Sequence, residues 1–147
     1  MINTNHNKNN LFNSPIEIGM RVLLILAQLH PDKLDLDNLA FFDYVITYSE
    51  DFDGPENLHP PVPNRLAELA MRREKMQKGL KLLISKEFIE PHLSKLGNHY
   101  KITMRGSQFL SCLSSPYYKK LWERAHWISD SYHHLIKHRK DVYNMGI

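Results

Sequence analysis

The residues best suited to chemistry lie near the C-terminal end, where Asp130, His134 and His138 follow one another in steps of four. On a helix this spacing puts the three side chains on one face, where imidazole and carboxylate groups can share a metal ion. No H-E-x-x-H motif and no pair of cysteines accompanies them. Histidines are also favoured near helix C-termini by the helix dipole. We therefore favour a solvated helix end and keep a metal-dependent hydrolase only as a third hypothesis.

Nucleophilic chemistry has weaker support. Cys112 lies among apolar residues, so we expect a buried thiol. Ser114 and Ser115 lack the G-x-S-x-G context, and there is no glycine-rich phosphate loop. The acidic residues at 50–56 could attract Mg²⁺, but without strand-borne carboxylates we interpret them as solvated loop charges. The sequence thus predicts a protein that is not an enzyme and needs no metal or cofactor.

A basic helix followed by a hairpin carries the second set of candidate functional residues. Its cations suit either phosphate groups or an acidic protein surface. Reading bases would need Asn, Gln or Arg side chains in the groove, and only Gln77 and the arginines qualify. We favour a solvated or protein-docking face over DNA contact. The cations are Arg72, Arg73, Lys75, Lys78 and Lys81 on the helix and Lys95 and Lys101 on the hairpin.

Surplus aromatic residues and one long loop are candidates for binding a partner. The loop at 51–63 contains four prolines and one glycine, which exclude regular structure and fix its shape. Aromatic and arginine side chains are enriched at protein interfaces, although a core role remains open for each. The candidates are Phe41, Phe42, Tyr44, Leu58, His59, Val62, Arg65, Tyr117, Trp122 and Trp127.

These residues need a scaffold, and the hydrophobic periodicity predicts a mainly α-helical one with a small β-hairpin. Ser14 and Pro15 begin a central helix, and helices are expected at 36–49 and 64–86. Alternation predicts strands at 88–93 and 99–103. A further helix passes Phe109, and Pro116 begins a last one that continues past Leu135. This order is typical of a winged helix-turn-helix with an additional C-terminal helix.

Length and composition fit one globular domain. The 147 residues are 42% hydrophobic, and we expect a disordered lead at 1–10, a domain at 11–138 and a tail at 139–147. A single cysteine and the lack of a secretory signal predict a cytoplasmic protein. Residues 1–60 carry three Lys/Arg against nine Asp/Glu, whereas residues 61–147 carry sixteen against seven. The basic half suits nucleic acid or an acidic protein surface.

Four segments stand in an order and spacing that resemble a known family. They are F-N-S-P-I-E-I-G-M-R at 12–21, D-G-P-E-N-L-H-P-P-V-P-N-R at 53–65, R-R-E at 72–74 and L-S-S-P-Y at 113–117. The sequence is similar, over roughly residues 11–130, to the middle component of ABC three-component defence systems, to which the Lamassu and Menshen types are related. The loop motif is the most specific of the four, because no generic fold demands it.

The resemblance implies a non-catalytic winged-helix adaptor in an anti-phage or anti-plasmid complex. Its partners would be an SMC- or Rad50-like ABC ATPase and an effector nuclease, with DNA reached through the assembled complex and no membrane contact. The alternative from the residues themselves is a stand-alone winged-helix transcriptional regulator. That alternative rests on the helix-plus-hairpin order and the basic half of the chain.

Overall fold

The computed structural model describes residues 14–60 and 63–144, without the side chains of Arg65 and residues 140–144. This part of the chain is mainly helical with a three-stranded antiparallel sheet, as predicted, although the first strand was not foreseen. The elements are α2 (Pro15–Gln28), β1 (Leu34–Asp35), α3 (Leu36–Thr47), the 3-10 helix η1 (Ser49–Phe52), α4 (Arg65–Ser85), β2 (Ile89–Ser94), β3 (Gly97–Ile102), α5 (Met104–Ser111), α6 (Pro116–Asp130) and α7 (Tyr132–Asn144).

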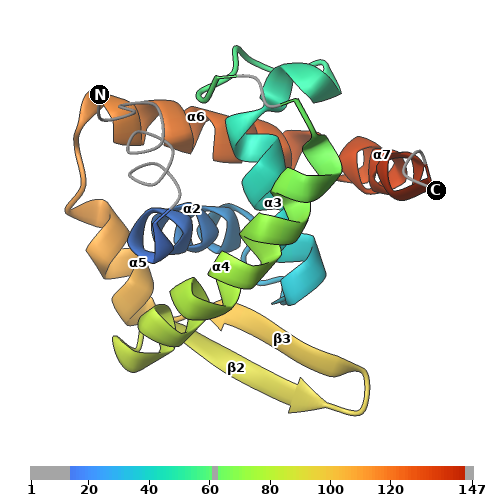
Figure 1. The fold of residues 1–147 in the computed structure, drawn as a ribbon. Helices are drawn as coiled ribbons and strands as arrows, with labels where there is room; N and C mark the ends of the chain where they lie inside the picture. The colour runs from blue at the N-terminus through green and yellow to red at the C-terminus, as the bar shows by residue number, and fades with distance from the viewer. Residues whose placement is uncertain (1–13, 61–62, 145–147) are drawn as a thin grey trace, which may run out of the picture.

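Helix α2 lies at the centre, packed against α3, α4, α5 and α6 (Figure 1). The Ser14 hydroxyl accepts a hydrogen bond from the Glu17 N–H at 3.3 Å, and Pro15 occupies the first turn. The helix therefore begins where the sequence predicted. From residue 21 to residue 26 every position is buried, which is what a helix surrounded on all sides requires.

Helix α3 is equally buried and α4 is amphipathic. Asp35 caps α3 by accepting from the Asn38 N–H at 2.8 Å. Helix α4 runs unbroken through Gly79, where a Cβ atom would lie 3.1 Å from the Pro15 carbonyl oxygen. Gly79 is thus a point of close approach between α4 and α2.

The sheet has the order β1-β3-β2, and the hairpin of β2 and β3 projects from one end of the molecule (Figure 1). Its register pairs Ile89 with Ile102 at the base and Ser94 with Gly97 at the tip. Ile89 and Ile102 are buried. Paired residues share a sheet face, so the base of the hairpin contributes to the core while the tip extends away from it.

The predicted single C-terminal helix is two helices. Helix α6 ends at Asp130, and Ser131, with ψ of 12°, departs from helical geometry before α7 begins. The N–H of Ser131 still bonds the Trp127 carbonyl at 2.9 Å, and the Leu135 N–H bonds the Ser131 carbonyl at 2.9 Å. Asp130 is therefore not on the helix that carries His134 and His138, and the continuous face expected for a metal site is absent.

Within the described ranges, no helix combines the length and the apolar character that crossing a membrane requires.

Candidate functional site

The loop between α3 and α4 is ordered over its described residues by its own hydrogen bonds. The Thr47 carbonyl ends α3 and accepts from the backbone N–H groups of Leu58 and His59, at 3.0 and 3.4 Å. Glu50 and Asn57 bond each other reciprocally through side chain and backbone, at 3.0 and 3.1 Å. The Ser49 hydroxyl donates to the Pro55 carbonyl at 2.6 Å. These bonds close residues 47–59 into a compact unit, which we call the strap.

Helix α6 holds the strap against the body. Arg124 donates from Nε and Nη2 to the Glu56 carbonyl oxygen, at 3.1 and 2.6 Å. Gly54 lies against Trp127 so closely that a Cβ atom would stand 2.4 Å from the indole ring. Such contact needs a residue without a side chain, which explains the glycine in the D-G-P motif. Arg124 and Trp127 therefore fix the shape and position of the strap.

A cluster of buried charges lies at the junction of α2, α3 and α4. The Asp43 carboxylate accepts from Arg21 Nε at 2.5 Å and Nη2 at 3.2 Å, a bidentate pair, and from Arg72 Nη1 at 3.0 Å. Arg72 Nη1 also donates to the Asp43 carbonyl at 2.9 Å, and its Nε to Glu68 at 3.0 Å. Arg21 and Asp43 are fully buried and Arg72 is 1% exposed. Two cations and two carboxylates balance in this cluster, which a buried site requires.

The electrostatics of the cluster extend to the strap. Burial would raise the pKa of the Asp43 carboxyl, but the charges of Arg21 and Arg72 and the bond from Arg21 lower it below its ordinary value. Burial and the same two arginines lower the pKa of His59 to about 3. His59 is therefore neutral at physiological pH, and its Nε2 shares a hydrogen bond of 3.3 Å with the Tyr117 hydroxyl of α6.

The structure divides the predicted partner-binding residues. Phe41, Phe42 and Tyr44 are at most 1% exposed, so they belong to the core and offer no surface to a partner. Their predicted role is corrected for a physical reason: α2, α4 and α6 pack around α3 and bury it over residues 39–47. His59 is also buried, whereas Leu58, Tyr117 and Trp127 are half-buried around the strap. Trp122 is 45% exposed and stacks on His126. Val62 and the side chain of Arg65 lie outside the described residues.

The predicted cations divide in the same way. Arg72 is buried, and its predicted contact with an outside partner is wrong because its guanidinium lies between Asp43 and Glu68. Arg73 is 54% exposed and pairs with Asp37 at 2.6 Å. The remaining cations keep at least part of their surface in solvent: Lys78, Lys81 and Lys95 are exposed, and Lys75 and Lys101 are half-buried.

Sequence reasoning missed four residues that build this region. Arg21 and Asp43 stand inside apolar runs: residues 22–26 after Arg21 are all buried, and so are residues 39–47 around Asp43. A charge in such a run is itself a signal, because a buried charge needs an opposite partner. Glu68 and Arg124 carry no comparable signal. Their roles depend on contacts 4 and 68 residues away along the chain.

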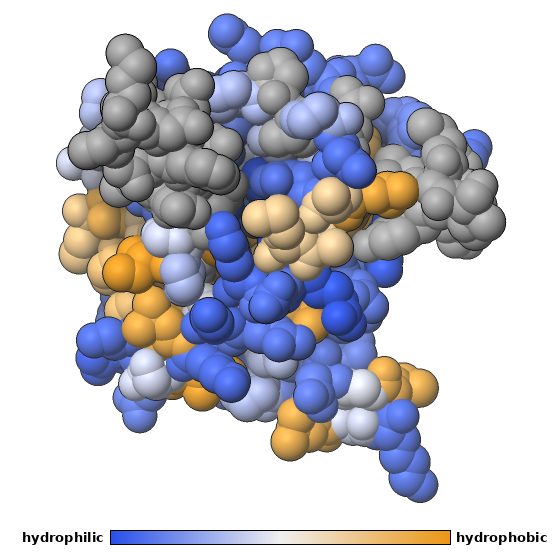
Figure 2. All heavy atoms as spheres, in the orientation of Figure 1, coloured by the Kyte–Doolittle hydropathy of each residue, from blue (hydrophilic) through white to orange (hydrophobic). Residues whose placement is uncertain are grey.

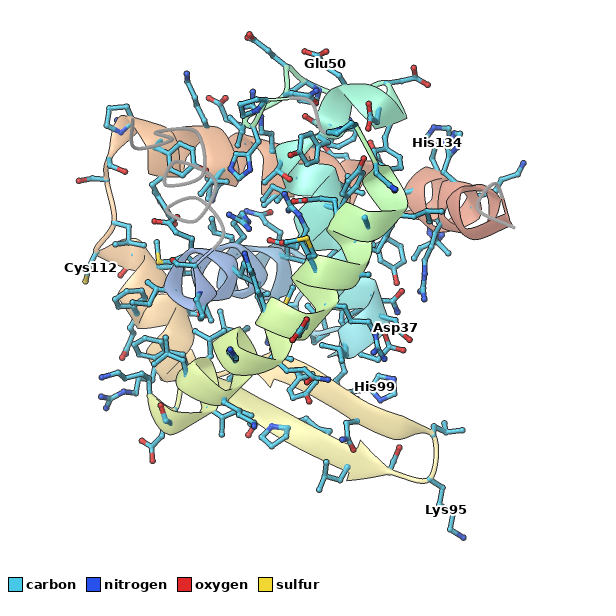
Figure 3. All side chains as sticks on the ribbon, viewed as in Figure 1. Asp37, Glu50, Lys95, His99, Cys112 and His134 are labelled. Atoms are coloured by element: carbon cyan, nitrogen blue, oxygen red, sulfur yellow. The ribbon has the colours of Figure 1, made fainter. Side chains whose placement is uncertain are left out.

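The geometry does not support the other candidate chemistry, which was a metal site or a nucleophilic cysteine. Among the described residues, no group of three or more His, Cys, Asp or Glu side chains could hold a metal ion. Cys112 is exposed, contrary to prediction, and its thiol lies 3.5 Å from the Gln108 carbonyl oxygen. The short helix α5 turns that side chain outward (Figure 3).

Comparison with protein families identifies the chain. Residues 11–142 match the family described as ABC-three component (ABC-3C) system Middle Component 2, and the protein belongs to that family. No curated protein and no solved structure gave a match.

The structure brings together residues from all four segments that carry the family resemblance. Arg21 from the first segment and Arg72 from the third both bond Asp43. His59 from the loop segment lies close enough for both arginines to shift its pKa, and it bonds Tyr117 from the fourth. The four segments, up to 96 residues apart in the chain, thus meet around one buried carboxylate and position the strap above it.

Proposed function

We propose that this chain is a non-catalytic winged-helix adaptor that links an SMC- or Rad50-like ABC ATPase to an effector nuclease in an anti-phage or anti-plasmid defence complex. The winged-helix assignment is supported by the order α2, β1, α3, α4, β2, β3 and by the sheet order β1-β3-β2. In such a fold α4 takes the recognition position and the hairpin is the wing. Membership of a middle-component family supports protein partners.

The observation that carries the proposal is the convergence of the four segments on the strap. Their charged and polar residues bond one another, and the bond between His59 and Tyr117 links this cluster to the strap, whose shape Arg124 and Trp127 fix. A loop fixed before binding loses little conformational entropy when a partner docks on it, which favours affinity. The strap presents Glu50, Asp51, Asp53 and Glu56 to solvent, whereas α4 and the hairpin present lysines. Two surfaces of opposite charge suit a subunit that contacts two partners.

In this proposal the adaptor docks on the head of the ATPase and keeps the nuclease inactive until the ATPase engages foreign DNA. The test is co-expression of the chain with the ATPase and effector of its own system, followed by size-exclusion chromatography with mass measurement. We expect one assembly that contains all three chains. Elution of the adaptor apart from both neighbours would refute the proposal.

A stand-alone DNA-binding regulator is the second candidate, favoured by the exposed lysines Lys78, Lys81 and Lys95. It predicts duplex binding by the isolated chain that weakens steeply with salt. Replacing Lys78 and Lys81 with alanine should weaken that binding and flatten its salt dependence by about one unit of slope for each phosphate that is no longer neutralised. DNA binding that is unchanged by both substitutions would exclude the stand-alone regulator.

A further inference from the structure

A groove lies between helix α4, the start of α3 and strand β3. Its volume is about 390 Å³, and it is open to solvent along one side. The apolar lining comes from Leu36, Leu80, Ile84 and Tyr100, and the polar lining from Asp35, Asp37, Gln77, Lys81 and Asn98. Ile84 is 36% exposed, although neighbouring positions on α4 such as Leu80 and Leu83 are covered by the core. The groove has a fixed shape, because the elements that line it pack against α2 and pair in the sheet.

The apolar surface of the groove continues along the hairpin. Tyr100 pairs with Pro91 and Asn98 pairs with Leu93, so these four residues share the sheet face on which Ile89 and Ile102 are buried. The body of the protein covers this face only near its base. Leu93 lies beyond the covered part and is 74% exposed. Along this sheet face, Ile89 and Ile102 lie in the core, Tyr100 and Asn98 line the groove, and Leu93 is uncovered.

The turn at the tip presents a second leucine in a fixed geometry. Ser94 and Gly97 close the turn, and the Ser94 hydroxyl accepts from the Leu96 N–H at 3.2 Å and lies 3.3 Å from the Gly97 carbonyl oxygen. Leu96 is 90% exposed. Hairpin turns favour Gly, Asn, Asp and Ser, and a leucine side chain contributes nothing to this one. Folding does not explain Leu96, whereas burial against a partner would.

The charge nearest the two leucines is positive, whereas Lys101, farther from the tip, lies opposite Glu90 in the sheet register. Residues 91–101 include Lys95 and Lys101 and no Asp or Glu. Lys95 points away from the body at the tip, and Figure 2 shows apolar residues beside hydrophilic ones over this end of the molecule (Figures 2 and 3). Lys81 adds a cation at the groove. Two carboxylates also line the groove: Asp35, which caps α3, and Asp37, which is paired with Arg73. A complementary surface therefore has an apolar centre, with one carboxylate where it meets Lys81 in the groove and another where it meets Lys95 at the tip.

We propose that the groove and the hairpin tip form one docking surface for the ABC ATPase subunit, which inserts an apolar segment flanked by carboxylates. This inference rests on the proposed adaptor function and names the surface that performs it. A protein partner is favoured over DNA because Leu93 and Leu96 gain from burial in an apolar cleft. DNA phosphates, by contrast, would engage only the lysines of the same surface.

The test compares two double variants of the full chain in binding to the co-expressed ATPase subunit. Leu93→Ser with Leu96→Ser removes the exposed leucines, and Ile16→Ser with Met104→Ser removes two other apolar residues, 65% and 79% exposed, away from the tip. We expect the hairpin variant to bind roughly tenfold or more weakly and the control to bind like the wild type. Lys95→Glu should weaken binding as well, with a smaller effect at high salt. Thermal melting of each variant checks that the fold is retained.

The outcomes separate this inference from the adaptor proposal. If the wild-type chain does not bind the ATPase at all, the adaptor proposal fails. If wild type and hairpin variant bind the ATPase equally, only the docking surface is refuted. The docking surface is also refuted if the hairpin substitutions leave ATPase binding intact and instead abolish binding to another partner. That partner could be the effector, a duplex DNA probe, or a second copy of this chain, detected as a dimer by mass measurement.

Discussion

The two adjacent arginines of α4 provide the sharpest test of the buried cluster. Arg72 and Arg73 are neighbours on one helix, and each pairs with an aspartate of α3. The Arg72 side chain is 1% exposed and its partner Asp43 is fully buried, whereas Arg73 and Asp37 are 54% and 48% exposed. We predict that Arg72→Met destabilises the protein strongly and that Arg73→Met does not. The sequence offers no reason to expect this difference, since both residues belong to the same basic run.

The magnitudes follow from burial. Removing one partner of a buried ion pair typically costs about 3–5 kcal/mol, because the remaining charge stays desolvated. Asp43 keeps its bidentate bond to Arg21, and Glu68 retains some contact with solvent, so we expect a value near the lower end, about 3 kcal/mol. An exposed pair such as Arg73 with Asp37 contributes roughly 0–1 kcal/mol. Methionine keeps an apolar side chain of similar length but removes the guanidinium, whose central carbon lies 5.8 and 5.3 Å from the ring centroids of Tyr44 and Tyr48.

Equilibrium unfolding in urea and thermal melting measure the difference. A domain of this size loses roughly 3–4 °C of Tm per kcal/mol, so Arg72→Met should melt about 10 °C below the wild type and Arg73→Met within about 3 °C of it. A double-mutant cycle with Asp43→Asn should show a coupling of about 1 kcal/mol or more for Arg72. Small and equal shifts for both arginines would refute the cluster and return Arg72 to the exposed basic face.

Three further predictions concern the strap and helix α6, which holds it. In the folded protein the pKa of His59 is about 3, so below pH 6.5 the unfolded chain takes up a proton that the folded chain does not. His59 should therefore lower the free energy of unfolding by about 2 kcal/mol at pH 5. His59→Gln should remove this part of the pH dependence measured by urea unfolding, whereas the control His126→Gln, at an exposed histidine, should retain it. Gly54→Ala should cost about 1–3 kcal/mol by overlap with Trp127 and change the tryptophan fluorescence, and Trp127→Leu should relieve it. Ser115→Ala removes the cap of α6 and should lower the unfolding free energy by about 1 kcal/mol, whereas an unchanged melting curve would contradict that capping role.

The sequence predicted most elements because their signals are local. Ser14 with Pro15 and Asn64 begin their helices as expected, and alternation identified the hairpin. Strand β1 has only two residues, too few for any periodicity, and it exists because Leu34 and Asp35 pair with β3. The break at Ser131 was missed for a related reason, since the apolar spacing continues across it to Leu135.

The candidate site was predicted in outline but not in its internal roles. The sequence identified the loop motif and its family, and family membership is shown over residues 11–142. It could not separate Arg72 from Arg73, because exposure depends on which face of α4 meets α3. It also offered Phe41, Phe42 and Tyr44 as partner-binding candidates while leaving a core role open, and the neighbouring helices cover all three. Aromatic residues suit cores and interfaces equally well, so composition alone does not distinguish the two.

By itself the sequence determined where most helices and the hairpin strands begin, which faces are apolar, and which family the chain resembles. These properties follow from capping, periodicity and motif spacing, all of which act over a few residues. Only the tertiary structure showed that Asp43 pairs with both Arg21 and Arg72, and that Trp127 and Arg124 hold the strap in place. The physical reason is that a buried charge or a close contact is defined by its partner, and these partners come from helices distant in the chain.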